Sequence, residues 1–228
     1  MVVRLWPSHL LVGPTGSGKT PLGEELERRG LGGRRCVHFD FGANLRTIAA
    51  APDAKTLLTA PELGSIRHSL ETGALFEDED MPMIVKILDM FAAQRDLTPG
   101  TLLVLNGLPR HRKQAESLAG TIAVELVTHL EADAAVIRDR IRLDPAGDRA
   151  ARADDRIEAV ERRLAVFRER TLPLIDFYRE RGIRVLSIPV TAGMSAGKMY
   201  EAVNNPVDRR ERDCIHSYSG ESPRRRHL

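Results

Sequence analysis

The chain has 228 residues, of which 42% are hydrophobic and 29% are charged, and it contains no apolar run of the roughly 18 residues that a membrane-spanning helix needs. This length suits one ordinary domain with a small insertion, and it buries a core without disulfide or metal staples. The net charge of +2 lies in residues 208–228, where six arginines outnumber four acidic residues, so the rest of the chain is balanced and indicates no polyanionic partner.

The two cysteines, Cys36 and Cys214, are too few for a four-ligand zinc site and have no cysteine near them in sequence. They favour a reducing setting. The opening residues carry no apolar signal segment followed by a small-residue cleavage site. We therefore expect a cytoplasmic protein with no membrane partner and no structural zinc.

Short apolar runs that alternate with helical patterns predict the fold. The clearest run is 102–105, which is apolar at every position, as a strand buried on both faces is. Alternation of this kind implies a parallel sheet covered by helices on both faces. We predict an α/β protein whose five-stranded parallel sheet has strands near residues 9–12, 35–39, 102–105, 122–127 and 185–190.

Three stretches predict helices with one apolar face. They lie at residues 19–29, at 83–91 and at 154–181, and we expect Pro173 to bend the last of them. Residues 43–94 contain helical pieces and no convincing strand, so they indicate a helical insertion between the second and third strands. The polar residues 143–154 predict a loop.

Residues 13–20, Gly-Pro-Thr-Gly-Ser-Gly-Lys-Thr, match the phosphate-binding pattern G-x-x-x-x-G-K-[ST] in full, between a predicted strand and a predicted helix. The glycines let several backbone N–H groups point at one anion, and the start of the helix adds unpaired donors. Lys19 can reach the β- and γ-phosphates, and Thr20 can offer its hydroxyl to Mg²⁺. We predict that ATP is bound by Gly13, Pro14, Thr15, Gly16, Ser17, Gly18, Lys19 and Thr20.

Further motifs, in order along residues 8–190, resemble those of the adenylate kinase family of nucleoside monophosphate kinases. His38-Phe-Asp-Phe-Gly-Ala-Asn-Leu-Arg46 is similar to the segment in which a glycine and, four residues later, an arginine bind the monophosphate. Residues 71–79 are similar to the stretch that lines the base, and Leu105-Asn-Gly-Leu-Pro-Arg110 resembles the strand-end Asp-Gly-Phe-Pro-Arg, which a base-binding glutamine follows. The resemblance implies monophosphate contacts at Gly42, Arg46, Gly73, Leu75, Phe76, Gly107, Arg110 and Gln114.

The second half of the chain adds the lid arginines of that family. Asp139-Arg-Ile141 is similar to the start of the lid, which implies that Arg140 contacts ATP. Arg152-Ala-Asp-Asp155 and Arg163-Leu164 resemble the lid-closing arginine, its paired aspartates and a second arginine. The resemblance therefore implies that Arg152 and Arg163 also contact the monophosphate.

Phosphoryl transfer explains why such an enzyme needs arginines from separate segments. The protein mainly aligns two polyphosphate groups and neutralises their charge. Arginine suits this task because its planar fork binds two oxygens at once and stays charged. We expect a mobile lid and a mobile insertion to exclude water. The residues expected to act in catalysis are Lys19, Arg110, Arg140, Arg152 and Arg163.

Several of these side chains have equally simple structural explanations. Arg163 can lie over the core beside the apolar face of its helix. Arg110 is the best placed, because it follows a buried strand, and ligands of open α/β sheets bind beyond the carboxyl ends of strands. Ordinary solvated charges account equally well for Arg46, Arg140 and Arg152, and helix N-terminal positions account for Asp154 and Asp155.

The sequence departs from the family near the expected metal. The acid of the family's strand-end motif is Asn106 here, and the acid after the glycine of the second-strand segment is Ala43. A neighbouring threonine of the family is replaced by Phe41. Asp40 is close in sequence and is the candidate to replace the missing carboxylates, if its side chain points toward the metal.

The resemblance implies a P-loop NTPase fold with a helical monophosphate-binding insertion and a short lid. The predicted organisation is a core of residues 1–42, 99–142 and 154–203, the insertion at 43–98, the lid at 143–153 and a disordered arginine-rich tail at 204–228.

Three hypotheses on function follow. The first is a nucleoside monophosphate kinase that transfers the γ-phosphate of ATP to AMP with Mg²⁺, as a monomer and without a nucleic-acid partner. The second is a regulatory module of the same fold that binds nucleotides without turnover. The third is a P-loop kinase of a small metabolite, which Gln114 and residues 73–76 disfavour because they suit a base.

Overall fold

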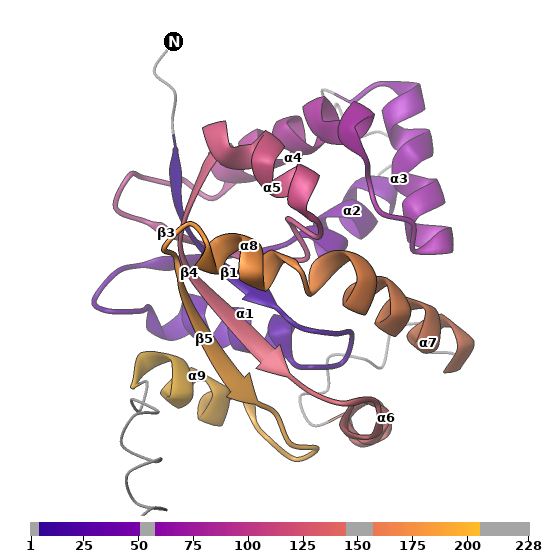
Figure 1. Cartoon of the computed structure of the whole chain (residues 1–228). Helices are drawn as coiled ribbons and strands as arrows, with labels where there is room; N and C mark the ends of the chain where they lie inside the picture. The colour runs from indigo at the N-terminus through magenta and orange to yellow at the C-terminus, as the bar shows by residue number, and fades with distance from the viewer. Residues whose placement is uncertain (1–4, 51–57, 145–156, 206–228) are drawn as a thin grey trace, which may run out of the picture.

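The computed structural model describes residues 5–50, 58–144 and 157–205. Within them a five-stranded, all-parallel sheet with strand order β2-β3-β1-β4-β5 forms the centre of the molecule (Figure 1). The predicted sheet is therefore confirmed. Its strands, some of them longer than predicted, are β1 (Trp6–Val12), β2 (Cys36–Asp40), β3 (Leu102–Asn106), β4 (Ile122–Glu131) and β5 (Arg184–Pro189).

Helices cover both faces of this sheet because successive side chains of each buried strand point to opposite sides. Leu11 and Val104 pack toward α1 (Lys19–Arg29) and α9 (Ala196–Asn204). Leu10 and Leu105 belong to the larger core on the other face. Figure 1 shows the sheet between these two layers, the second of which contains α4 (Met81–Gln94), α5 (Arg112–Ser117) and α8 (Leu174–Arg179).

The predicted insertion contains helices and turns, and no strand, in its described residues 43–50 and 58–98. It contains α2 (Phe41–Ala50), α3 (Ala60–Thr72), the 3₁₀ turn η1 (Asp78–Asp80) and α4. Thr59 and Glu62 form a capping box at the start of α3, and Gly73 ends that helix in the left-handed conformation with φ 75°. This end releases the chain toward the strand ends, where it forms one wall of the pocket described below.

The long helix predicted at 154–181 is interrupted. It consists of α7 (Ile157–Val166), a π-helical turn η3 (Phe167–Thr171) and α8. The π turn precedes Pro173, so the interruption begins earlier than the proline alone predicts. Val160 and Leu164 of α7 pack on α6 (Ala134–Leu143). Elsewhere in the fold, the short 3₁₀ turn η2 (Leu118–Gly120) leads into β4.

The predicted lid and tail fall almost wholly outside the described residues. Leu143 is the last residue of α6 and Asp144 is its C-cap, so the lid boundary lies at a helix end. The tail boundary at residue 204 coincides with the last residue of α9. In the described part of the chain, no helix is long and apolar enough to cross a membrane.

Candidate active site

The phosphate loop joins the carboxyl end of β1 to the start of α1. Gly18 has φ +100°, a backbone conformation that is strained for any residue with a side chain. A Cβ at this position would also lie 2.8 Å from the Cε of Met199. A Cβ on Gly13 would lie 2.6 Å from the Ser17 Oγ. A side chain at either position would therefore collide with its neighbours, and at Gly18 it would also strain the backbone.

Lys19 opens α1 and folds back over this loop. Its Nζ donates to the carbonyl oxygens of Gly13 at 2.7 Å and Pro14 at 2.8 Å. These contacts hold the ammonium group at the mouth of the loop. Because charge-assisted contacts to phosphate are stronger than contacts to neutral carbonyls, a bound polyphosphate would compete for the same group.

Three polar side chains meet beside the loop, where β2, β3 and α1 converge. The hydroxyl of Thr20 donates to Asp40 Oδ2 at 2.7 Å, and the Asn106 amide donates to the same Oδ2 at 2.9 Å and to the Thr20 hydroxyl at 3.0 Å. The Ala43 N–H donates to Asp40 Oδ1 at 2.8 Å, so Asp40 also caps α2. The Asp40 side chain thus points to the site, as its suggested role near a metal requires.

These residues border one pocket of about 250 Å³ at the carboxyl ends of the strands. This is the edge of an open α/β sheet where ligands bind. The pocket brings together sixteen of the residues that the sequence singled out, from both halves of the chain: Gly13, Thr15, Gly16, Gly18, Lys19, Thr20, Gly42, Arg46, Gly73, Leu75, Phe76, Gly107, Arg110, Gln114, Arg140 and Arg163.

Two guanidinium groups from separate segments line the same pocket as the phosphate loop. Arg110 follows β3 and Arg163 comes from α7, and both line the pocket. Burial, and then the positive charge of Arg163, lower the pKa of Arg110 to about 10. Within the described residues, no carboxylate pairs with the Arg110 guanidinium. A bound anion would offset the burial of Arg110 and its repulsion by Arg163, so these two side chains are candidates for binding an anion.

Arg46 of α2 reaches the same pocket from the insertion. A Cβ placed on Gly42 would lie 3.4 Å from the Arg46 Nη1 and 3.5 Å from Asp40 Oδ1. These are ordinary van der Waals distances, so Gly42 lies next to both the Arg46 guanidinium and the Asp40 carboxylate.

Arg140 is held more tightly than a solvated charge. It is 3% exposed, its Nε donates to the Gly16 carbonyl at 3.1 Å, and its Nη1 donates to the carbonyls of Thr191 at 2.8 Å and Met194 at 2.9 Å. It therefore ties the phosphate loop to the segment that leads from β5 to α9. The interpretation of Arg140 as an ordinary solvated charge is therefore wrong. Besides the predicted contact with ATP, this side chain positions the phosphate loop.

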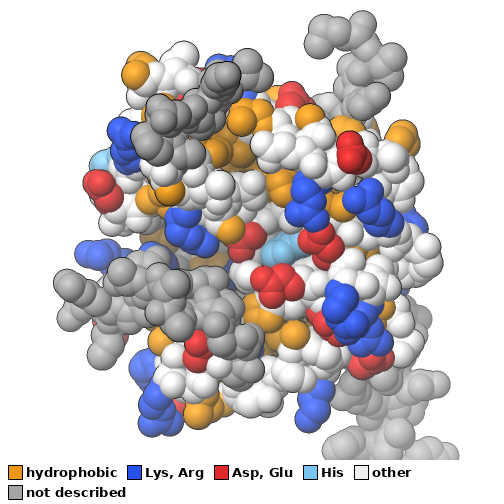
Figure 2. Space-filling model, turned by 180° about the vertical axis from the view of Figure 1, so that it is seen from behind, with side chains coloured by type: hydrophobic (Ala, Val, Ile, Leu, Met, Phe, Trp, Pro, Cys, Tyr) orange, Lys and Arg blue, Asp and Glu red, His pale blue; other side chains and the backbone are white. Residues whose placement is uncertain are grey.

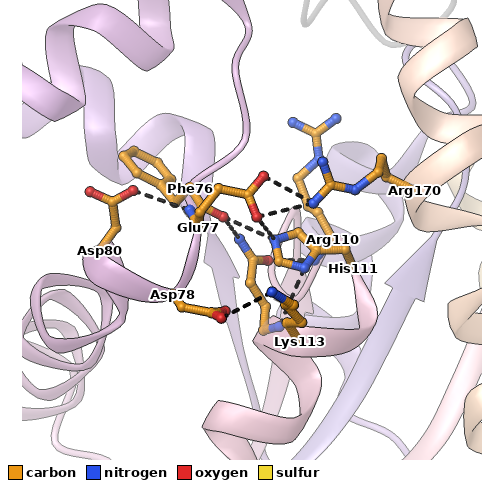
Figure 3. Close-up of polar contacts among 9 residues, drawn as sticks. Phe76, Glu77, Asp78, Asp80, Arg110, His111, Lys113 and Arg170 are labelled. Carbon is orange, nitrogen blue, oxygen red and sulfur yellow. Dashed lines mark hydrogen bonds and ion pairs between the residues drawn. The ribbon is translucent and has the colours of Figure 1, made fainter.

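Gln114 lines the pocket, but its amide is already engaged. Its Oε1 accepts from the Arg110 N–H at 2.7 Å and its Nε2 donates to the Phe76 carbonyl at 2.9 Å, which His111 also contacts at 2.9 Å (Figure 3). Gln114 therefore joins the end of β3 to the 73–76 segment. A contact to a base remains a prediction for this side chain.

An ion pair connects the same segment to the π turn. Arg170 donates to both carboxylate oxygens of Glu77, at 2.9 and 3.1 Å, and His111 lies beside Glu77 (Figure 3). The π turn also contributes Phe167 and Thr171 to the pocket. Neither pocket contact is predicted from the sequence, because a single π turn has no periodicity that distinguishes it from the surrounding helix.

Some predicted residues do not line the pocket. Pro14 and Ser17 belong to the loop but are buried beneath it, with Ser17 fully so. Arg152 lies outside the described residues.

On the face drawn in Figure 2, Lys and Arg side chains are interspersed with Asp and Glu side chains, as the balanced composition indicates.

A glycine-rich phosphate loop that shares one pocket with arginines from later segments is the arrangement of an ATP-dependent phosphotransferase of the P-loop class. Curated adenylate kinases match this chain. One from Stenotrophomonas maltophilia (strain R551-3) is 31% identical over 179 residues, covering 76% of this chain and 86% of the relative. One from Deinococcus radiodurans is 33% identical over 182 residues, covering 76% and 84%. The chain belongs to the adenylate kinase family.

Two other comparisons were made. No family model matches the chain. A gluconokinase structure from Sinorhizobium meliloti 1021 has a TM-score of 0.47 at 16% identity, covering 94% of this chain and 99% of that one. A sugar kinase structure from Janibacter sp. HTCC2649 has a TM-score of 0.49 at 16% identity, covering 86% and 91%.

Proposed function

We propose that the protein is a nucleoside monophosphate kinase that transfers the γ-phosphate of ATP to AMP, forming two molecules of ADP. The observation that carries this proposal is that Arg110 and Arg163 line the same pocket as Lys19, with no carboxylate of the described residues on Arg110. A second anion site at this position suits an acceptor that itself bears a phosphate.

In this mechanism the protein acts by alignment and by neutralising charge. The phosphate loop and Lys19 hold the triphosphate, and Arg110, Arg163 and Arg46 hold the acceptor phosphate. With both anions fixed on opposite sides of one pocket, an acceptor oxygen attacks the γ-phosphorus, and ADP leaves on the far side. No protein side chain has to form a covalent bond.

Apolar side chains between these charges favour a nucleobase over a sugar acid. Phe41 and Phe76 meet edge to face with ring centroids 5.7 Å apart, and Leu45, Leu70 and Phe167 complete the wall. A planar base can pack on such a wall, whereas a polyhydroxylated acceptor would leave its hydroxyl groups unpaired there.

Thr20 and Asp40 would hold Mg²⁺, because a hydroxyl and a carboxylate 2.7 Å apart at the edge of a phosphate loop are ligands that this hard cation accepts. The ion would screen the charge of the β- and γ-phosphates. Kinases of this family generally use Mg²⁺ together with ATP, which supports the same requirement in this protein.

The second candidate function is a kinase whose acceptor is a hydroxyl group, such as that of a small sugar metabolite. The Asp40 carboxylate is the observation that favours it. A hydroxyl group needs a base to take its proton, and Asp40 lines the pocket. Three hydrogen bonds already occupy that carboxylate, from Thr20, Ala43 and Asn106. It is therefore better suited to hold a cation than to accept a proton.

A coupled assay of ADP release over a panel of acceptors tests the proposal. The panel contains AMP, other nucleoside monophosphates and phosphate-free sugar acids, each with ATP and Mg²⁺. We expect turnover with AMP and none with the sugar acids. Lys19→Ala should reduce this turnover by at least about a hundredfold, because removing one donor to the transition state of such a reaction typically costs that much.

The outcomes separate the three hypotheses. Turnover with a sugar acid and none with AMP would establish the second candidate. Binding of ATP and AMP with no turnover of any acceptor would leave a regulatory module. Unchanged turnover in Lys19→Ala would contradict the role assigned to that residue.

A further inference from the structure

The carboxylate nearest the phosphate loop stands on β2, and its neighbour on β3 is an amide. Asp40 and Asn106 are the last residues of their strands and are paired in register. Their side chains meet, with Asn106 Nδ2 2.9 Å from Asp40 Oδ2. Asn106 is also paired in register with Leu11 of β1, two residues before the loop. The two positions therefore present side chains to the same point.

The hydrogen bonds at this point have a definite direction. Thr20 donates its hydroxyl hydrogen to Asp40, so the lone pairs of its oxygen face away from the carboxylate, and one of them accepts from Asn106. A hydroxyl that gives its hydrogen to a carboxylate becomes a better ligand for a cation, and the carboxylate fixes its orientation. Asp40 thus acts on Thr20 whether or not it touches the metal itself.

The two positions also exclude each other as acids when no cation is present. Two carboxylates at the separation of these side chains would repel each other, because like charges in hydrogen-bond contact interact strongly at a partly buried site. An amide at 106 instead donates to Asp40 and removes that repulsion. Asn106 is 5% exposed, so an unpaired acid there would also be costly to bury.

We propose that Asp40 supplies the carboxylate of the Mg²⁺ site, in place of an acid at the end of β3, and that positions 40 and 106 are interchangeable in this role. The proposal rests on the proposed function only in requiring that ATP binds with Mg²⁺. In this proposal the amide at position 106 and the carboxylate at position 40 form one arrangement, and the Mg²⁺ site is retained although the acid at the end of β3 is missing.

Calorimetric titration of the full chain with a non-hydrolysable ATP analogue tests this without turnover. Each variant is titrated in excess EDTA and in excess Mg²⁺, and the ratio of the two affinities measures the metal's contribution. In Asp40→Asn we expect that ratio to fall by about tenfold to a hundredfold, as for groups that orient metal ligands. The affinity in EDTA should stay the same, because asparagine can still cap α2 through its oxygen.

The reciprocal variant is the decisive arm. Asp40→Asn combined with Asn106→Asp should recover most of the metal contribution, because it moves the carboxylate to the neighbouring strand. Asn106→Asp alone should raise the metal contribution above that of the unmodified chain. Asp89→Asn, an exposed acid-to-amide change on α4, is the matched control and should leave the ratio unchanged.

A full metal contribution in Asp40→Asn, or no recovery in the double variant, would overturn the proposal. If Asp40→Asn does not fold, Asn106→Asp decides alone, since an unchanged ratio there contradicts a site at this point. A chain that binds the Mg²⁺ complex as expected but phosphorylates no monophosphate would contradict the proposed acceptor and leave the metal site standing.

Discussion

Arg110 is the residue on which acceptor binding depends most directly. Its guanidinium is buried beside Arg163 at the end of β3, and its pKa is lowered to about 10. The side chain remains charged at neutral pH because even this lowered pKa lies well above 7. A bound phosphate would offset the desolvation of Arg110 and its repulsion by Arg163, so this arrangement favours the state in which an anion is bound.

We predict that Arg110→Lys raises the KM for the acceptor by about tenfold to a hundredfold and leaves the affinity for ATP unchanged. Lysine keeps a positive charge but loses the second arm of the fork, and a charge-assisted hydrogen bond contributes about 1.5–3 kcal/mol. Steady-state kinetics with varied acceptor measure this. Arg34→Lys, in an exposed pair with Glu125, is the control. An unchanged acceptor KM would mean that Arg110 does not bind it.

Among the elements, the contact of α1 with β2 is the tightest that involves a glycine. Gly23 lies on the buried face of α1, and a Cβ there would come within 2.3 Å of the His38 ring. The ring belongs to β2 and is itself buried, so it has little room to move. The spacing between helix and strand therefore depends on the missing side chain.

We predict that Gly23→Ala destabilises the protein by about 1–3 kcal/mol, although alanine favours a helix, because overpacking a core outweighs the helix propensity. Gly64→Ala is the matched control. Gly64 is exposed within α3 and a Cβ there meets nothing within 4 Å, so alanine should stabilise by up to about 1 kcal/mol. Urea unfolding measures both changes. Two changes of the same sign would contradict this account of the α1–β2 contact.

At the scale of the whole molecule, the sheet buries histidines that must stay neutral. His9 of β1 is fully buried against the Thr128 hydroxyl at 2.8 Å, and burial lowers its pKa to about 4. Burial also lowers the pKa values of His38 and His129. Below about pH 6.5 these histidines therefore bind protons in the unfolded chain and stay neutral in the folded chain.

We predict that the free energy of unfolding falls as pH drops from about 6.5 toward 5. Each fully buried histidine contributes up to about 1.4 kcal/mol per pH unit in this window, because only the unfolded state gains the proton. Urea unfolding at several pH values measures the slope. His9→Gln should reduce the slope, since glutamine does not titrate but still reaches Thr128. A slope unaffected by that change would show that His9 is not buried as a neutral ring.

Much of the molecule follows from local patterns in the sequence. Uniformly apolar runs such as 102–105 predict strands buried on both faces, and the glycine spacing of residues 13–20 predicts a phosphate loop wherever a strand precedes it and a helix follows. Both features are set by neighbours along the chain, which is why the sheet and the loop were predicted correctly. The order of motifs also indicated the family.

Only the tertiary structure decided what the separate side chains do together. Asp40 and Asn106 are far apart in sequence, and their contact depends on which strands are neighbours and in which register. The attachment of Arg140 to two backbone segments, the phosphate loop and the β5–α9 connection, and the contacts of Gln114 depend likewise on where loops end. A side chain's charge and size are local properties, whereas its partners are set by strand order and packing, and these arise only when the whole chain has folded.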